Sequence, residues 1–311
     1  MADRFETRMV YGEALLELGR ARRDVVVLDA DLYRSTRTVL FRDAFPERFF
    51  DVGIAEQDMV STAAGLAASG LIPYCNSFAM FITARCYDQI RIQIAYPSLP
   101  VKLVGSSGGL TQGPDGASHQ SLEDVALMRA LPNMAVVVPA DDVETRRATA
   151  AIADWPGPVY LRTGRYPTPR LFGPDYCFEM GAMQRLREGN DVAILACGHL
   201  TAKALEAAEL LAHEGLQARV VNVSTIKPLD AVALRAQVTG VRRAFTLEEH
   251  SIIGGLGGAV AEVLAEDARV PLTRLGVRDQ FGESGLADEL LAKHGLQPEG
   301  IRASVLETLG G

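Results

Sequence analysis

Residues 101–130 read VKLVGSSGGLTQGPDGASHQSLEDVALMRA, which is an apolar run, a polar glycine-rich stretch and a helix-forming run in succession. The apolar run at 101–104 predicts a buried strand, and residues 121–130 predict a helix. The polar residues 108–120 between them predict a long loop. A loop of that length inside a compact domain is usually functional, so we expect a site on it.

Two side chains on this loop can do chemistry. Asp115 supplies a carboxylate and His119 an imidazole, which together can bind hydroxyl groups or move protons. An exposed turn with an Asx cap is the ordinary alternative, but the length of the loop and the Asp/His pair favour a function. Where the loop ends, Ser121 and Asp124 are spaced as in a capping box for the next helix.

The same alternation of strand and helix continues on both sides of this stretch. The apolar runs are continuous rather than alternating with polar residues, as in strands that are buried on both faces. We therefore expect an α/β domain with a mostly parallel sheet and helices on both faces. The other expected strands are 25–29, 49–52, 135–138 and 159–162, and the other expected helices are 8–19, 56–69, 79–96 and 142–154.

Three prolines within residues 166–174 interrupt this pattern, and a second alternating block follows. The prediction is a first domain over residues 1–168, a linker over 169–185, and a smaller α/β domain over 186–311. In the second domain the expected strands are 192–196, 218–223, 244–247 and 272–277, and the expected helices are 201–213, 229–237 and 260–267.

Composition excludes several classes of protein. The 311 residues include 31 Lys and Arg against 39 Asp and Glu, and the net charge of −8 argues against a nucleic-acid partner. No run approaches the roughly 20 apolar residues that span a bilayer, and the first residues lack a secretory apolar core. The four cysteines have no CxxC spacing. We therefore expect a cytoplasmic protein whose cysteines are reduced and lie in the core.

Glu56 belongs to a second candidate motif, Gly-Ile-Ala-Glu-Gln at residues 53–57. The motif lies between an expected strand and an expected helix, at the edge where open α/β sheets bind ligands. A glutamate in the first turn of a helix is also stabilised by the helix dipole. On this feature alone, the dipole is the better explanation.

Two further sets of residues are ambiguous when taken alone. Phe78 and Phe81 share one face of an expected helix, a spacing that usually means core. Arg8, Ser35 and Arg165 are candidate contacts for an anion, although each is an ordinary surface residue by itself.

The glycine cluster at residues 254–258 follows a strand and opens a helix, where a phosphate group can bind. It lacks the full G-x-G-x-x-G spacing and the lysine of a P-loop. Close packing of the helix against the strand is therefore the favoured interpretation.

Four segments together resemble the carboxyl-terminal half of transketolases, and the resemblance covers nearly the whole chain. They are GIAEQ at 53–57, NSFAMFITARCYDQIR at 76–91, GPDGASHQSLED at 113–124 and HSIIGGLGGAVAEVLAE at 250–266. The chain looks like the second subunit of a split transketolase. The resemblance implies a pyrimidine-binding domain of the thiamine diphosphate enzymes followed by a transketolase C-terminal domain.

The resemblance also implies roles for residues near the cofactor. Glu56 matches the glutamate that hydrogen-bonds the aminopyrimidine ring and activates the cofactor. Phe81 matches the aromatic residue that stacks on this ring, with Phe78 beside it, which reverses the core interpretation of the pair. Asp31 matches an aspartate near the cofactor.

On the substrate side, Asp115 and His119 match residues that bind sugar hydroxyls, and we expect His119 to assist proton transfer. Arg8, Ser35 and Arg165 match contacts to the phosphate end of the sugar. A pair of guanidinium groups suits a dianion, because each offers a planar fork of donors.

Two positions depart from the family pattern. Ser107 stands at the phosphate end where the family commonly has histidine, and Pro114 stands where the family has glutamate. The first change removes a donor to the phosphate and the second a carboxylate near the contact between subunits. These departures put the usual sugar-phosphate substrate in question, although a ketose phosphate is still the expected donor, and they leave the thiamine chemistry unchanged.

The sequence lacks the Gly-Asp-Gly element, followed by Asn, that holds magnesium and the diphosphate in this family. The resemblance therefore implies that Mg²⁺ is held mainly by a partner subunit with the diphosphate-binding domain, in an assembly of two copies of each chain. We expect transfer of a two-carbon ketol unit from a ketose to an aldose. The alternatives are the beta subunit of a 2-oxoacid dehydrogenase and a non-catalytic assembly subunit.

Overall fold

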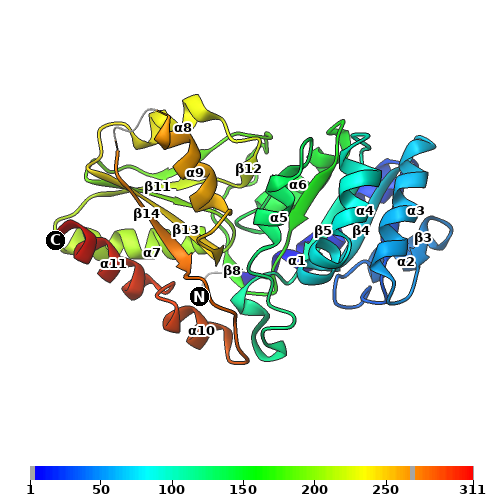
Figure 1. Ribbon diagram of the computed structural model, residues 1–311, viewed down its shortest axis with the longest axis horizontal. Coiled ribbons are helices and arrows are strands. Elements are labelled where there is room, and N and C mark those ends of the chain that lie inside the picture. The colour runs from blue at the N-terminus through cyan, green and yellow to red at the C-terminus, as the bar shows by residue number, and fades with distance from the viewer. Residues whose placement is uncertain (1–3, 267–269, 311) are drawn as a thin grey trace.

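The computed structural model describes residues 4–266 and 270–310, which form two α/β domains side by side (Figure 1). The first domain, drawn mainly in blue to green, is built on a seven-stranded sheet with the strand order β12-β6-β7-β5-β4-β2-β3. Its strands are β2 (Val25–Asp29), β3 (Phe49–Asp51), β4 (Ile72–Phe78), β5 (Lys102–Ser106), β6 (Ala135–Val137), β7 (Val159–Arg162) and β12 (Thr225–Lys227).

Helices cover both faces of this sheet, as predicted. Val25 and Val27 of β2 pack in one apolar cluster, whereas Val26 and Leu28 pack in another on the opposite face. This arrangement explains why the strand is apolar at successive positions. One face is covered by α1 (Thr7–Ala21), α2 (Val39–Ala44) and α6 (Asp142–Ala151), and the other by α3 (Glu56–Ala68), α4 (Tyr87–Gln89) and α5 (Asp124–Ala130).

The helix expected at 79–96 is irregular. Wide π-helical turns at η2 (Phe81–Arg85) and η3 (Ile90–Ala95) flank the single α-helical turn of α4. The hydroxyl of Thr83 donates to the carbonyl of Ala79 at 2.6 Å, within the first of these turns. Such turns are frequent at functional sites, because they change the direction of the side chains that follow.

The second domain, drawn in yellow to red in Figure 1, contains a sheet in the order β14-β13-β10-β11-β9. Two apolar clusters again occupy its two faces. Its strands are β9 (Gln184–Arg187), β10 (Val192–Ala196), β11 (Ala218–Asn222), β13 (Arg243–Ser251) and β14 (Leu272–Val277). One face carries α8 (Ala231–Val238) and α9 (Leu256–Ala265), and the other carries α7 (Leu200–His213), α10 (Ala287–Lys293) and α11 (Pro298–Gly310).

The two domains share structure. The edge strand β12 follows β11 in the chain but pairs antiparallel with β6 in the sheet of the first domain. One apolar cluster includes Met59 and Val125 of the first domain together with Val221 and Val260 of the second. In the large sheet of each domain the strands pair in parallel, except for the antiparallel edge strands β12 in the first and β9 in the second.

Several expected boundaries differ from the structure. The capping box does not form, and α5 begins at Asp124 rather than at residue 121, because the Asp124 carboxylate is buried against Arg162. Helix α9 begins at Leu256, four residues before the expected start, and the expected end at Asp267 lies outside the described residues.

Three of the four cysteines are buried, but Cys177 is exposed. The prediction that all four lie in the core is wrong at this position, because Cys177 follows the proline-rich stretch and lies outside both sheets. Within the described ranges, no helix is long and apolar enough to cross a membrane. A short two-stranded sheet joins β1 (Arg4–Phe5) to β8 (Thr168–Pro169).

Candidate active site at the carboxyl edge of the first sheet

Glu56 is the first residue of α3 and lies beyond the carboxyl end of β3. Its side chain is only 1% exposed. Oε1 accepts a hydrogen bond from Ser77 Oγ at 3.2 Å, and Oε2 accepts one from the Arg85 guanidinium at 2.7 Å. A buried carboxylate at this edge of the sheet is thus held by one hydroxyl and one cation.

Phe78, Phe81 and His119 form an aromatic cluster beside Glu56. Phe78 ends β4 and Phe81 begins η2, with ring centroids 6.1 Å apart. The His119 ring lies edge-on to both, at 6.0 Å from Phe78 and 5.1 Å from Phe81. Arg85 also stacks on the Phe81 ring, at 4.5 Å. Both phenylalanines are half-buried, so the simple core interpretation of this pair is wrong.

The loop with Asp115 and His119 leaves β5 and forms a 3₁₀ segment, η4 (Leu110–Asp115). Asp115 is exposed and accepts hydrogen bonds from Gln112 Nε2 at 2.6 Å and from Arg165 at 3.3 Å. His119 Nδ1 lies 3.0 Å from Ser118 Oγ. Asp115 and Arg165 therefore meet, whereas His119 joins the aromatic cluster.

Arg8 and Ser35 also meet. Arg8 lies at the start of α1, where it pairs with Glu6 at 2.7 Å and donates to the carbonyl of Ser35 at 3.3 Å. Asp31 lies on the same loop as Ser35 and is exposed, with a left-handed φ of 60°. Its backbone N–H donates to Asp51 at 3.0 Å.

Ser107 is 1% exposed and has a left-handed φ of 58°. Its backbone N–H donates to the carbonyl of Thr163 at 2.8 Å, and its hydroxyl lies 3.3 Å from that of Ser106. Pro114 is exposed next to Asp115. Ser107 therefore lies behind the loop surface, whereas Pro114 lies on it.

The loop with Asp31 and Ser35 is anchored on Asp29, at the carboxyl end of β2. The Asp29 carboxylate accepts a hydrogen bond from the Leu32 N–H at 2.6 Å and from the hydroxyls of Thr36 and Thr38 at 2.8 Å each. Burial raises the pKa of Asp29 to about 7, against the opposing effect of these hydrogen bonds.

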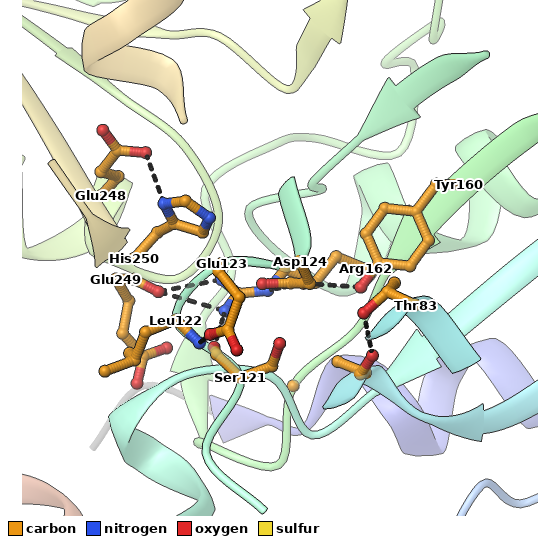
Figure 2. Close-up of polar contacts among 12 residues, drawn as sticks. Thr83, Ser121, Leu122, Glu123, Asp124, Tyr160, Arg162, Glu248, Glu249 and His250 are labelled. Atoms are coloured by element: carbon orange, nitrogen blue, oxygen red, sulfur yellow. Dashed lines mark hydrogen bonds and ion pairs between the residues drawn. The ribbon is translucent and has the colours of Figure 1, made fainter. Parts of the chain in front are cut away.

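A buried polar group lies behind the site, at the contact between the domains (Figure 2). The Asp124 carboxylate lies 2.8 Å from the Arg162 guanidinium and accepts a hydrogen bond from the Tyr160 hydroxyl at 2.6 Å. Arg162 also donates to the carbonyl of Glu249 at 3.1 Å, and thus links the first domain to β13.

The glycine cluster at residues 254–258 receives a carboxylate of the protein itself. Glu248 accepts hydrogen bonds from the backbone N–H groups of Leu256 and Gly257, both at 2.7 Å. A Cβ atom at Gly255 would lie 2.1 Å from the same carboxylate. The first turn of α9 therefore packs on Glu248, which agrees with the packing interpretation.

Sequence reasoning missed Arg85 and Glu249. An available signal for Arg85 was its position four residues after Phe81, where a cation and an aromatic ring meet on a helical face. Glu249 gave no local signal, because it contacts Thr111, which is 138 residues away in the chain.

Two family models match the chain. Residues 3–169 match the family model for the pyrimidine binding domain of transketolase, and residues 181–301 match that for its C-terminal domain. The chain belongs to the transketolase family. A putative transketolase C-terminal section from Methanocaldococcus jannaschii is 46% identical over 305 residues, which are 97% of this chain and 96% of that protein.

Two further transketolase relatives are informative. A 6-deoxy-6-sulfo-D-fructose transketolase subunit from a Clostridium species is 45% identical over 294 residues, covering 94% of this chain and 91% of that one. A solved structure described as a split gene transketolase, inactive beta4 tetramer, is 49% identical. It has a TM-score of 0.92 and covers 98% of this chain and 99% of that chain.

The transketolase family implies thiamine diphosphate as a cofactor, and the residues present fit one end of it. A buried carboxylate beside the half-buried ring of Phe81 suits an aminopyrimidine ring, which has a nitrogen to bind and a flat surface to stack. In residues 4–266 and 270–310, no three His, Cys, Asp or Glu side chains form a group that could hold a metal ion. The residues of this chain therefore fit the aminopyrimidine ring of the cofactor, and not its diphosphate.

Proposed function

We propose that this chain is the pyrimidine-binding subunit of a split transketolase that moves a two-carbon ketol unit from a ketose to an aldose. The observation that carries the proposal is the buried carboxylate of Glu56 beside Phe81 and His119, on a chain whose relatives are split transketolase subunits. When bound, thiamine diphosphate supplies the carbon nucleophile for such a transfer.

Each side chain of the site has a role in this proposal. Glu56 holds a proton at the ring nitrogen of the aminopyrimidine, and Phe81, with Phe78 beside it, stacks on the ring. Asp31 lies near the cofactor. On the substrate side, His119 and Asp115 bind hydroxyl groups of the ketose, and His119 moves a proton as the carbon–carbon bond breaks.

The end of the ketose away from the bond that breaks is expected to carry an anionic group. Arg8 and Arg165 provide two guanidinium groups near the loops that carry Ser35 and Asp115. A relative is named for 6-deoxy-6-sulfo-D-fructose, a ketose with a sulfonate at its end. Because Ser107 lacks the imidazole donor of the family histidine, we propose an anionic ketose whose terminal group needs fewer donors than the usual phosphate.

The diphosphate of the cofactor and its Mg²⁺ are assigned to a second subunit, with two copies of each chain in the assembly. Support comes from the names of relatives as subunits and from the description of a 49% identical chain as a split gene transketolase, inactive beta4 tetramer. The cytoplasmic location expected from the sequence stays a prediction.

The decisive experiment measures thiamine diphosphate binding with magnesium, by the chain alone and by the complex purified with its native partner. We expect binding and ketol transfer by the complex only. Tight binding by the chain alone contradicts the assignment of the diphosphate to a partner, and lack of binding in both states contradicts the catalytic proposal.

The matched variant for this experiment is Glu56→Gln, which keeps the size of the side chain but cannot ionise. Its amide oxygen can still accept from Arg85, while its amide N–H can only donate to Ser77 Oγ. The complex should still assemble and bind cofactor, while turnover falls by about 10²–10⁴-fold, the range for loss of an acid–base group. Full activity in this variant removes Glu56 from the mechanism.

A further inference from the structure

Glu249, at the carboxyl end of β13 in the second domain, contacts the loop that carries Asp115 and His119. Its Oε1 accepts a hydrogen bond from the backbone N–H of Thr111 at 2.5 Å, and its Oε2 accepts one from the Thr111 hydroxyl at 3.2 Å. The side chain is buried. Both oxygens are therefore used to fix one residue of the loop.

Gly109 makes this contact possible. It has a left-handed φ of 90°, and a Cβ atom at this position would lie 2.3 Å from the Glu249 carboxyl carbon. Any side chain here would displace the carboxylate or the loop. The backbone of the loop thus passes directly against Glu249.

His199, just before α7, holds the carboxylate from its other side. His199 Nε2 lies 2.8 Å from Glu249 Oε2, and the ring of Tyr166 packs on the imidazole with centroids 4.9 Å apart. A buried carboxylate is costly unless it is paired and hydrogen-bonded. Glu249 has hydrogen-bond partners on Thr111 and a close contact to His199 Nε2, and its position is therefore defined.

The second domain also holds the far end of the loop. Gln120 Nε2 donates to the carbonyl of Glu283 at 2.8 Å and to those of Leu110 and Gly113 within the loop. Arg162 donates to the carbonyls of Ser121 and Glu249, each at 3.1 Å (Figure 2). The segment with Asp115 and His119 is thus fixed at both ends.

We propose that Glu249, oriented by His199, is a positioning residue that places Asp115 and His119 for the donor ketose. This inference rests on the proposed function, and it gives the second domain a part in substrate binding in addition to assembly. Glu249 bonds Thr111 and touches neither Phe78 nor Phe81, and His119 is the one member of the aromatic cluster that the loop carries. The loss of Glu249 is therefore expected to affect the donor sugar more than the cofactor.

The test compares Glu249→Ala, Glu249→Gln and His199→Leu in the complex with the native partner. Glu262→Gln is the matched control, because Glu262 also joins the second domain to the first, through Arg129, without touching the loop. The measurements are KM and kcat for the donor ketose, KM for hydroxypyruvate as a short donor, the Kd of thiamine diphosphate, and hydrogen exchange of residues 108–120.

In Glu249→Ala, we expect a roughly tenfold rise in KM for the ketose, the size of one lost hydrogen bond to a charged group. Hydroxypyruvate lacks the distal hydroxyls, so its KM should stay within about twofold, as should the Kd of the cofactor. Glu249→Gln should restore most of the ketose affinity, because an amide oxygen still accepts from Thr111. His199→Leu should raise KM for the ketose by less than Glu249→Ala does. Glu262→Gln should leave this KM unchanged.

If Glu249→Ala raises KM equally for the ketose and for hydroxypyruvate, or raises neither, the proposal is overturned. If Glu249→Ala does not fold, Glu249→Gln and His199→Leu decide it by the same comparison of donors. If the wild-type complex transfers no ketol unit, the proposed function fails. Hydrogen exchange then still tests whether Glu249 and His199 fix the loop, because residues 108–120 should exchange faster in His199→Leu than in wild type or Glu262→Gln.

Discussion

Arg85 donates a hydrogen bond of 2.7 Å to the buried carboxylate of Glu56 while its guanidinium stacks on the ring of Phe81. The side chain that is proposed to bind the cofactor ring and the ring that is proposed to stack on it are thus joined by one cation. Arg85 is half-exposed and is the last residue of the π-helical turn η2.

Replacement of Arg85 by methionine should therefore disturb both partners. We expect a loss of about 1–2 kcal/mol in stability, because Glu56 keeps only the Ser77 hydroxyl in a buried site. The Kd of thiamine diphosphate for the complex should rise about tenfold, and Arg85→Lys should fall between this variant and wild type because lysine keeps the charge but not the planar stack. Titration of the cofactor into each complex checks this, and a Kd equal to that of wild type in Arg85→Met contradicts it.

Arg162→Met tests the buried contact between the domains. Loss of one partner of a buried ion pair costs about 3–5 kcal/mol, and Asp124 would be left with the Tyr160 hydroxyl alone. Arg302→Met removes a surface pair with Glu214 and should cost at most about 1 kcal/mol. Denaturant unfolding gives the free energy of unfolding of both variants. An equal decrease in the two variants would show that the burial of Arg162 is unimportant.

Asp29 gives the stability of the chain a pH dependence. Its folded pKa of about 7 lies above the ordinary value of 3.8, so the folded state keeps a proton that the unfolded state has lost between these values. The stability contributed by this proton is therefore present at low pH and is lost as pH rises to about 7, by up to roughly 1.4 kcal/mol per pH unit.

Asp29→Asn should remove this dependence, since the amide stays neutral. The free energy of unfolding of wild type relative to Asp29→Asn should fall between about pH 5 and 7 and level off above pH 8. Asp43→Asn, at an exposed acid that pairs with Arg42, should leave the wild-type slope unchanged. Parallel curves for wild type and Asp29→Asn would show that Asp29 is ionised throughout this range.

Ser107→His should shift the preference among anionic donors. The position already has a left-handed backbone, which histidine tolerates better than most residues. Ser107 is buried behind the loop surface, so the longer imidazole has to reach past this position to add a donor at the proposed anion end. We expect KM for a phosphorylated ketose to fall by about tenfold, the size of one hydrogen bond to a charged group. Ser107→Leu supplies bulk without a donor, and an equal effect in both variants would show that the change is steric.

Many features of the fold could be predicted from local patterns. The apolar residues of β2 at successive positions predict burial on both faces, and Val25 and Val26 indeed pack in different clusters. The long loop after β5 follows from its glycine and polar content. The fold class and the family membership are confirmed, while the roles of the site residues stay predictions that the geometry supports.

The rest depended on contacts between distant parts of the chain. Asp124 has the spacing of a capping residue, but burial against Arg162 prevails over the local pattern. The helix at 79–96 contains strong apolar periodicity, and only the packing of its wide turns shows that it is irregular. Glu249 reaches the loop from another sheet, which no window of sequence can show.

Strand β12 has a consequence for the exchange of domains. A reading frame that ended after β8 would leave Val136 and Val137 of β6 as an uncovered edge, and bare edges of this kind promote aggregation. A substitute for the second domain therefore has to bring its own strand to cover β6, because the first domain alone does not complete its sheet.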